Sequence, residues 1–499
     1  MCIFGPKPSF MSATLAISIL IIYFAILVFI SIRTSKGADV NAFFTANKSV
    51  PWYLVAFGMI GTSLSGVTFI SVPGAVLNNA FSYFQMVMGF TLGYFFIATV
   101  LMPLYYRMNL ISIYGYFEQR FGWWSYKSAS AIFLLSRTLG SAVRLYVAAQ
   151  VLQIAIYDPL GVPFWLSVLI TIALIYVYTF KGGIKTIVIT DTLQTTFLIT
   201  AVVLTILLIT KEMHLSLGEM VQVVSDSKYS QIFFFEGGWS DAKNFFKLFF
   251  SGAFIAIVMT GMDQDLMQKN LTCKNIGEAQ KNMLWFTVVL VFVNLMFLGL
   301  GALMYIYADQ IGFTLPAKTD DFYPLMALKH FGSFALGSGG VLVAITFLIG
   351  ITAATYASSD SALTALTTAF CVDFLDIEKK EEKERVKLKN RTHLIFSLVF
   401  FLTILVFHAV NSSDLITAIY KIASYTYGPL LGLFAYGIYS KRGVNDKMVP
   451  WVCIAAPVLT FILVVLIEKY VGYKFGFENL LLNGLLTILG LFVFRGSKA

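Results

Sequence analysis

Apolar runs of about 20 residues recur along almost the whole of this chain, and about 20 residues is the length a helix needs to cross a bilayer. The sequence of 499 residues is 58% hydrophobic and 12% charged, whereas soluble proteins carry roughly 25% charged residues. We therefore predict an all-α, multi-pass membrane protein with about 13 spans. The predicted spans lie near residues 12–32, 52–78, 84–106, 128–157, 163–180, 187–210, 246–268, 282–307, 337–374, 393–411, 417–439, 449–468 and 478–494.

The Lys and Arg residues between the runs predict the orientation. With the N-terminus outside, the inner loops hold roughly three times as many Lys and Arg as the outer loops, as the positive-inside rule requires. The inner set includes Lys269 and the linker 377–391, whose mixed charges predict a solvated loop or short helix. The long segments 211–245 and 308–335 then lie outside as loops or short helices. The net charge of +9 is spread over loops rather than gathered in a basic groove, so no nucleic acid partner is expected.

One apolar stretch, Ile349 to Cys371, is interrupted by hydroxyl residues and by the carboxylate of Asp360. A bare carboxylate near the bilayer centre costs at least ~2.5 kcal/mol, so such residues usually mark an ion or substrate path. Ser, Thr and Asp supply hard oxygen ligands, which suit Na⁺ or a proton and suit transition metals poorly. The stretch predicts cation-coupled transport.

Two predicted spans contain residues that weaken a continuous helix. The second span carries glycines and five hydroxyls between Phe57 and Gly74, which favours a broken helix that lines a cavity over a small-residue packing face. The seventh span contains Ser251-Gly252-Ala253 and Thr260-Gly261-Met262-Asp263-Gln264-Asp265. Breaks at corresponding positions in two halves indicate a transporter's central site, and these lie five helices apart, as an inverted five-helix repeat requires. Asp263 and Asp265 also fit a solvated helix terminus.

Two further charged positions lie within predicted spans or at their ends. Arg144 lies well inside the fourth span, and Arg137 lies about two turns earlier on roughly the same face. The planar guanidinium of Arg144 suits a substrate carboxylate, or it is the counter-ion of Asp360 or Asp191; both interpretations stay open. Asp191 opens the sixth span, where it is either a helix N-cap or an ion ligand.

The sequence argues against two other classes of membrane protein. Four cysteines and four histidines form no ligand-spaced or nucleophile–base pair, so neither an intramembrane enzyme nor a metal centre is expected. A transport-like sensor remains a remote alternative, because no output domain follows Phe494.

Four motifs stand out together. They are Gly61-Thr62-Ser63-Leu64-Ser65 through Thr68-Phe69-Ile70-Ser71-Val72-Pro73, Gly182-Gly183-Ile184 with Thr190-Asp191, Gln264-Asp265 with Gln268, and Ala357-Ser358-Ser359-Asp360-Ser361. In these positions the chain resembles the sodium/solute symporter family, which includes sodium–glucose, sodium–proline and sodium–sialic acid transporters. The resemblance implies the leucine-transporter-type inverted repeat within one transporter domain, residues 1–499. Its parts would be an extra N-terminal helix near 12–32, a first repeat 52–210, a second repeat 246–439 and C-terminal helices 449–494.

The resemblance also implies two cation sites. The principal sodium site would use backbone carbonyls of Gly61, Leu64 and Ala354 and the hydroxyl of Ser358. Ala357 stands where relatives often have Ser, so a water or the Ala357 carbonyl would replace that ligand. A second cation site would comprise Asp191, Asp360 and Ser361. Relatives usually have Ser where Asp360 stands, and the extra carboxylate would strengthen that site or make it proton-sensitive.

For the substrate, the resemblance to sialic acid transporters implies a pocket with the hydroxyls of Ser63, Ser65 and Thr68 and with Arg144 as the carboxylate-binding residue. Tyr83 and Val87 depart from the family's aromatic and glutamine positions, and Gln85 is the nearby substitute. We predict a sodium-coupled symporter in a bacterial-type inner membrane that imports a sugar acid such as sialic acid. A neutral sugar, polyol or other small carboxylate is the alternative. The expected partners are sodium, this solute and the bilayer, with no obligate protein partner.

Overall fold

The computed structural model describes residues 13–36, 40–333, 336–410 and 415–496, and this part of the chain is helical apart from one isolated bridge between Val444 and Arg495. Eight of its helices are long and apolar enough to cross a membrane, or up to ten when each bent pair counts as one span. Three shorter apolar helices, Phe164–Phe180, Gly428–Tyr439 and Asn479–Val493, add to these. The predicted all-α membrane fold is therefore confirmed, while the number of about 13 spans and the orientation stay predictions.

The apolar helices lie at the predicted spans, although the fifth and sixth predicted spans form one element and the predicted span 417–439 is divided into two helices. The apolar helices are α1 (Ala13–Thr34), α5 (Tyr83–Phe96), which continues through a π-helical turn into α6 (Met102–Arg107), α8 (Trp123–Leu152), α9 (Phe164–Glu212), α13 (Ile276–Gln310), α15 (Gly337–Asp373), α16 (Glu382–Val410), α17 (Leu415–Thr426), α18 (Gly428–Tyr439), α19 (Val449–Val471) and α20 (Asn479–Val493).

Both predicted breaks are present. The second span consists of α3 (Trp52–Ser63) and α4 (Gly66–Asn79), which meet at 59°. The seventh consists of α11 (Phe245–Ala256) with the π-helix η5 (Ile257–Gly261), and of α12 (Gln264–Asn270), at 69°. The predicted repeats 52–210 and 246–439 each begin with one of these bent pairs, and their boundaries stay a prediction.

The fifth and sixth predicted spans form the single element α9, with a break at one glycine. Gly183 has φ 56° and ψ −158°, a conformation that residues with a Cβ rarely adopt. A Cβ at this position would lie 2.4 Å from the Cα of Phe43 in α2 (Val40–Thr45). Glycine is thus required here both by the backbone conformation and by the close approach of α2.

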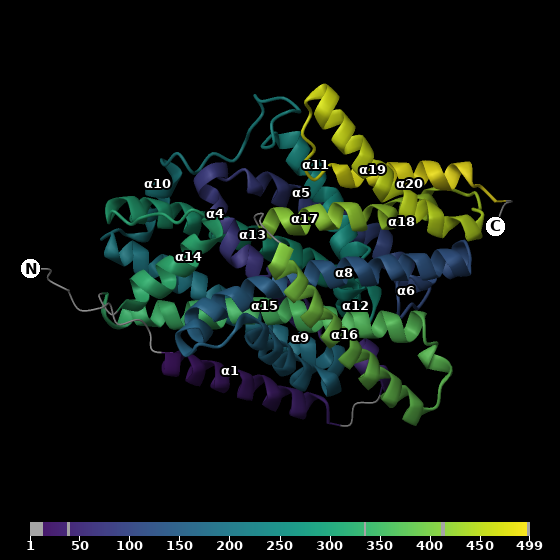
Figure 1. The fold of residues 1–499 in the computed structure, drawn as a ribbon, viewed down its shortest axis with the longest axis horizontal. Coiled ribbons are helices and arrows are strands. Elements are labelled where there is room, and N and C mark those ends of the chain that lie inside the picture. The colour runs from purple at the N-terminus through teal and green to yellow at the C-terminus, as the bar shows by residue number, and fades with distance from the viewer. Residues whose placement is uncertain (1–12, 37–39, 334–335, 411–414, 497–499) are drawn as a thin grey trace, which may run out of the picture.

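The hydroxyl-rich helix α15 lies at the centre of the molecule. In its apolar window 72% of the residues are buried, compared with 22% for the window that covers α19. α15 packs against α9, α8 and α16, and α1 lies along the outer side of α9 and α15. In Figure 1, α1 forms one edge and α19 and α20 form the opposite edge, with α8 and α15 between them. The polar stretch is therefore inside the bundle and away from lipid.

The predicted outer segments contain short elements. Residues 211–245 include α10 (Leu217–Ser225), which begins with a capping box of Ser216 and Glu219, and residues 308–335 include α14 (Phe322–Leu325). α10 and α14 lie at the same end of the molecule (Figure 1). Most of the charged linker 377–391 forms a 3-10 turn and the first turns of α16.

Candidate functional site

A cavity with polar walls lies inside the bundle at the break between α3 and α4. Its volume, traced by the centre of a water-sized sphere, is ≈ 80 Å³, which is room for several waters. A larger solute therefore binds with movement of the lining side chains. The lining is mostly polar at the break and mostly apolar on α5, α11 and α13. Its residues are Thr62, Ser63, Leu64, Ser65, Val67, Thr68, Tyr83, Phe90, Tyr94, Arg137, Arg144, Ile255, Ala256, Met259, Thr260, Leu266, Leu290 and Asn294.

Five of the six residues predicted to bind substrate line this cavity: Ser63, Ser65, Thr68, Tyr83 and Arg144. Sequence reasoning did not assign Thr260 or Asn294 to it. Asn294 is buried, and its Oδ1 has no hydrogen-bond partner in the described structure while its amide donates to the Leu290 carbonyl at 2.8 Å. A buried acceptor without a partner is costly, so Asn294 is suited to a hydroxyl or N–H of a bound solute.

The sixth residue, Gln85, is elsewhere. Its amide donates to the carbonyls of Ser82 and Lys243, at 3.2 and 2.9 Å, and its Oε1 accepts from the N–H of Phe234 at 3.2 Å. The side chain is fully buried and absent from the cavity lining. Gln85 anchors the segment around 234–243 to the start of α5, so it does not replace the glutamine missing at Val87 in this conformation.

Arg137 lies between the two carboxylates at the second break and interacts with both. Its guanidinium forms an ion pair with Asp265 and lies 3.7 Å from Asp263 Oδ2. Both carboxylates are fully buried, and Tyr427 donates to Asp263 while Ser361 donates to Asp265. The solvated-terminus interpretation of these two residues is wrong, because α8 supplies a buried cation that allows them to stay inside the bundle.

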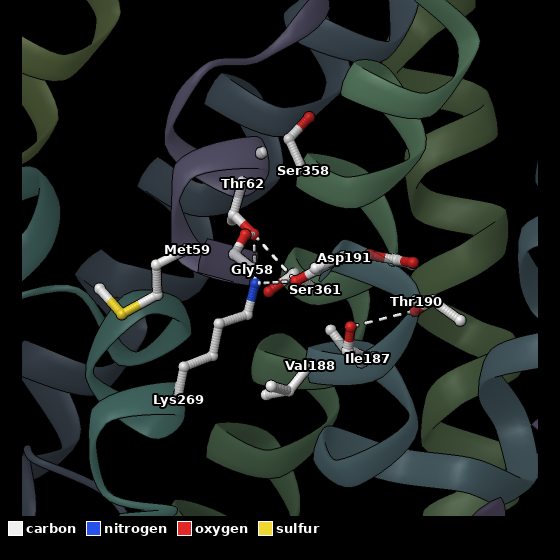
Figure 2. Close-up of polar contacts among 12 residues, drawn as sticks. Gly58, Met59, Thr62, Ile187, Val188, Thr190, Asp191, Lys269, Ser358 and Ser361 are labelled. Atoms are coloured by element: carbon white, nitrogen blue, oxygen red, sulfur yellow. Dashed lines mark hydrogen bonds and ion pairs between the residues drawn. The ribbon is translucent and has the colours of Figure 1, made fainter. Parts of the chain in front are cut away.

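Asp191 pairs with a lysine from the second break. The Lys269 Nζ lies 2.5 Å from Asp191 Oδ2, and the Thr62 hydroxyl donates to the same oxygen at 3.0 Å. Figure 2 shows the Lys269 side chain extended to both groups. Asp191 lies eight residues beyond the Gly183 break, inside α9, so the N-cap interpretation is wrong. Lys269 is fully buried, so it is not the inner-loop charge that the orientation count assumed.

Asp360 has a different environment from Asp191. The Tyr178 hydroxyl donates to Asp360 Oδ2 at 2.7 Å, while Oδ1 has no hydrogen-bond partner in the described structure. Asp360 still interacts electrostatically with Asp191 and Lys269. Ser361, the third residue predicted for the second cation site, donates its hydroxyl to Asp265. Thus Asp191 and Asp360 share one electrostatic environment, and Ser361 links it to the Arg137 ion pair.

The residues predicted for the principal sodium site lie where α15 faces the first break. Leu64 has φ −85° and ψ 72°, which ends the helical hydrogen bonding of α3, so carbonyls of its last turn have no helical donor. A Cβ built on Gly66 would lie 2.1 Å from Thr355 Oγ1, which places the α15 turn from Ala354 to Ser358 against the break. Ala354, Ala357 and Ser358 are all fully buried.

Two residues of this region were missed by sequence reasoning. Thr355 contributes a buried hydroxyl with no hydrogen-bond partner in the described structure, directly beside Gly66. Its position in the hydroxyl-rich stretch pointed to a candidate ligand. Six other Ser and Thr residues follow within thirteen positions, however, so the sequence could not single it out. Lys269 gave no signal, because a lysine at the end of a span is typical of an inner loop.

Arg144 lies between the cavity and Asp263. It lines the cavity and interacts electrostatically with Asp263 and Tyr427. The ion-pair partner of Asp191 is Lys269, and the hydrogen bond to Asp360 Oδ2 comes from Tyr178. The interpretation of Arg144 as the counter-ion of Asp191 or Asp360 is therefore not supported by these contacts.

The profile of the sodium:solute symporter family matches residues 43–447. The chain belongs to this family. Among curated proteins it is 26% identical over 445 residues to the sodium/sialic acid symporter NanT of Aliivibrio fischeri, covering 86% of this chain and 83% of that protein. It is 25% identical over 423 residues to the sodium-coupled monocarboxylate transporter 2 of Danio rerio, covering 82% of this chain and 65% of that protein.

The fold comparison agrees with this assignment. A Na⁺-coupled sialic acid symporter solved in a substrate-bound, outward-open state superposes with a TM-score of 0.79 at 20% identity, covering 96% of this chain and 97% of that one. This sodium:solute symporter family member is accordingly a multi-pass membrane transporter of a small solute, with sodium as the co-transported ion, and not an enzyme. The predicted family, fold class and sodium coupling are confirmed.

Proposed function

We propose that this symporter imports a small hydroxylated carboxylate, most simply a sugar acid of the sialic acid type, across the inner membrane of a bacterium. The observation that carries the proposal is the guanidinium of Arg144 in the lining of the same cavity as the hydroxyls of Ser63, Ser65 and Thr68. A guanidinium fork binds a carboxylate through two charge-assisted hydrogen bonds. The sodium/sialic acid symporter NanT, 26% identical to this chain, supports the same class of substrate.

The other polar groups of the cavity favour a substrate with several hydroxyls. Ser63, Ser65 and Thr68 lie on the side of the break, and Thr260 and Asn294 lie on the side of α11 and α13. A simple monocarboxylate, the alternative suggested by the Danio rerio relative, uses only the arginine. It would leave these groups without partners once water is displaced, which lowers affinity. The polar groups on both walls therefore favour the sugar acid.

The sodium that drives uptake would bind at the first break. We assign the principal site to carbonyls of Gly61, Leu64, Ala354 and Ala357 and to the Ser358 hydroxyl. In the described structure Ser358 Oγ donates to the Thr355 carbonyl at 2.9 Å, which leaves its lone pairs available to a cation. A second cation would bind at Asp191, Asp360 and Ser361.

Buried charge supports two cations for an anionic substrate. The four carboxylates of Asp191, Asp263, Asp265 and Asp360 face the three cations of Arg137, Arg144 and Lys269, as their ion pairs and electrostatic interactions indicate. With all seven groups ionised the cluster would carry one net negative charge, and a substrate carboxylate would add another. Because uncompensated buried charge is strongly unfavourable, two monovalent cations would restore neutrality.

The direct test is uptake by purified protein in proteoliposomes, with a panel of labelled sugar acids, neutral sugars and monocarboxylates. An inward sodium gradient should drive uptake of a sugar acid, and replacing sodium with choline at fixed pH should abolish it. A neutral sugar or a monocarboxylate as the best substrate would contradict the proposed substrate class, but not the family.

The Arg144→Lys variant tests the carboxylate contact. A point ammonium cannot reproduce the fork, so binding should weaken by about 1.5–3 kcal/mol, which is more than tenfold. The substrate's methyl ester should bind the wild type as poorly as the acid binds the variant, and it should lose little more in the variant. If the Arg144→Lys variant binds the acid with wild-type affinity, Arg144 interacts with Asp263 and does not bind the substrate carboxylate.

A further inference from the structure

The site predicted for a second cation already holds a positive charge from the chain itself. The ammonium of Lys269 lies 2.5 Å from Asp191 Oδ2 and also contacts the Thr62 hydroxyl. Lys269 reaches this position from α12, the inner half of the second bent pair, while Thr62 belongs to α3 of the first pair (Figure 2). All seven residues of α12 are buried. The contact therefore connects both bent pairs to α9.

One ammonium serves two carboxylates here. Lys269 interacts electrostatically with Asp191 and with Asp360. Asp360 itself accepts a hydrogen bond from the neutral hydroxyl of Tyr178. No salt bridge to Asp360 forms in the described part of the chain. With both carboxylates ionised, the local charge is therefore negative by one unit even with Lys269 in place.

Three oxygens of this environment have no hydrogen-bond partner in the described structure: Asp191 Oδ1, Asp360 Oδ1 and Gln194 Oε1. All three side chains are fully buried. Gln194 is hydrogen-bonded to Tyr23 of α1 at 3.0 Å, and Tyr23 interacts electrostatically with both aspartates. Buried oxygens that lack donors suit a hard monovalent cation. A sodium ion on Asp191 Oδ1 would lie beside the ammonium on Oδ2, where the two cations repel each other.

We propose that Lys269 is a built-in competitor of sodium at Asp191, so that the second cation binds tightly only when the ammonium leaves this carboxylate. The proposal rests on the second cation site of the proposed function. Sodium occupancy of this site and the contact between α12 and α9 are then mutually antagonistic. The apparent sodium affinity of the transporter consequently reports the position of α12 as well as the strength of the ion's ligands.

The test is sodium binding by purified protein, measured as thermal stabilisation by NaCl against choline chloride at constant ionic strength, and as bound ²²Na⁺ per protein. A ligand that binds only the folded state stabilises it by an amount that grows with the logarithm of the ligand concentration once that concentration exceeds the dissociation constant. Lys269→Met, of similar length but without charge, should lower the half-maximal sodium concentration for the weaker site by about threefold or more, because a repelling charge is removed. Lys269→Arg, which keeps the charge, should stay close to the wild type.

Three controls separate this effect from altered folding. Adding Asp191→Asn to Lys269→Met should abolish the gain in sodium affinity. Lys247→Met removes a different buried lysine, paired with Glu478 at 2.9 Å outside this site, and should leave the sodium curve unchanged. Lys269→Gln, which is neutral and can still hydrogen-bond to Thr62, repeats the test if the methionine variant does not fold.

Each result has one meaning. Tighter sodium binding in Lys269→Met or Lys269→Gln that depends on Asp191 supports the competition. Sodium binding that is unchanged or weaker in a folded neutral variant overturns it, and Lys269 is then a structural partner of Asp191. If the wild type shows no sodium response at all, the proposed cation sites fail, independently of Lys269.

Discussion

The two bent pairs of helices have similar geometry and opposite chemistry. The break between α3 and α4 consists of Gly, Ser, Leu and Thr residues, and it bends by 59°. The break between η5 and α12 bends by 69°, but α12 and its N-cap carry Asp263, Asp265 and Lys269. Both bends expose backbone at membrane depth, which is tolerated only where protein or a cavity surrounds it.

The first break offers ligands, whereas the second supplies fixed charge. Around Leu64, freed carbonyls and hydroxyls face the cavity and the turn of α15 at Thr355. At the second break, the charged groups are paired with Arg137 on α8 and Asp191 on α9. An uncharged break is therefore suited to binding and releasing ions and solute. The charged break sets the net charge inside the bundle, and we expect this net charge to decide how many cations bind.

The largest effect is expected from Arg137→Met, which removes the cation of the second break. Asp263 and Asp265 would remain buried without their ion-pair partner, which typically costs 3–5 kcal/mol. We expect a strong loss of folded protein, measured by thermal unfolding in detergent with size-exclusion chromatography. Arg137→Lys should lose less. A stable Arg137→Met variant would show that the charges of the second break do not depend on α8.

A smaller effect is expected from Gly66→Ala at the first break. The added Cβ would meet Thr355 Oγ1 at 2.1 Å, and such overpacking costs about 1–3 kcal/mol. The double variant Gly66→Ala with Thr355→Ala removes the overlap and should recover most of the unfolding temperature. Gly140→Ala in α8, where no atom lies within 4 Å, is the matched control. Failure of the double variant to recover stability would mean that α15 does not set the space at this break.

The Asp360→Ala substitution tests whether the net charge inside the bundle sets the number of bound cations. Without this carboxylate, Lys269 and Asp191 form a neutral pair and the cluster no longer needs a second cation. We expect the sodium-to-substrate stoichiometry, or the Hill coefficient for sodium, to fall, as measured by paired ²²Na⁺ and substrate fluxes. Asp360→Asn should behave in the same way while keeping the hydrogen bond from Tyr178. An unchanged stoichiometry would leave Asp360 as a structural partner of Tyr178.

The smallest effect is expected from Ser358→Ala, which removes one neutral ligand from the principal sodium site. A single neutral polar contact is worth about 0.5–1.5 kcal/mol. The sodium concentration for half-maximal uptake should rise accordingly, with the maximal rate little changed. Ser359→Ala, on the same turn with its hydroxyl bonded to the Thr355 carbonyl at 2.8 Å, is the control. Equal effects of both substitutions would argue against a specific role for Ser358.

The sequence by itself indicated where the apolar helices and both breaks lie, and it indicated five of the eighteen residues that line the cavity. These features are local: apolar length decides whether a helix can span, and glycines with hydroxyls decide where it breaks. Ser63, Ser65, Thr68 and Arg144 could be assigned because they belong to such local patterns, supported by a family resemblance. The same local reasoning could not place Gln85, whose partners Lys243 and Phe234 lie about 150 residues away.

Only the tertiary structure decided which charges neutralise one another. Asp191 and Lys269 are 78 residues apart, and Arg137 and Asp265 are 128 apart, so no periodicity connects them. A lysine after a span looks like an inner-loop charge, and an aspartate before one looks like a helix cap. The packing of α12 against α3 and α9 buries these groups instead. Burial makes their pairing obligatory, and this pairing fixes the charge left for the transported cations.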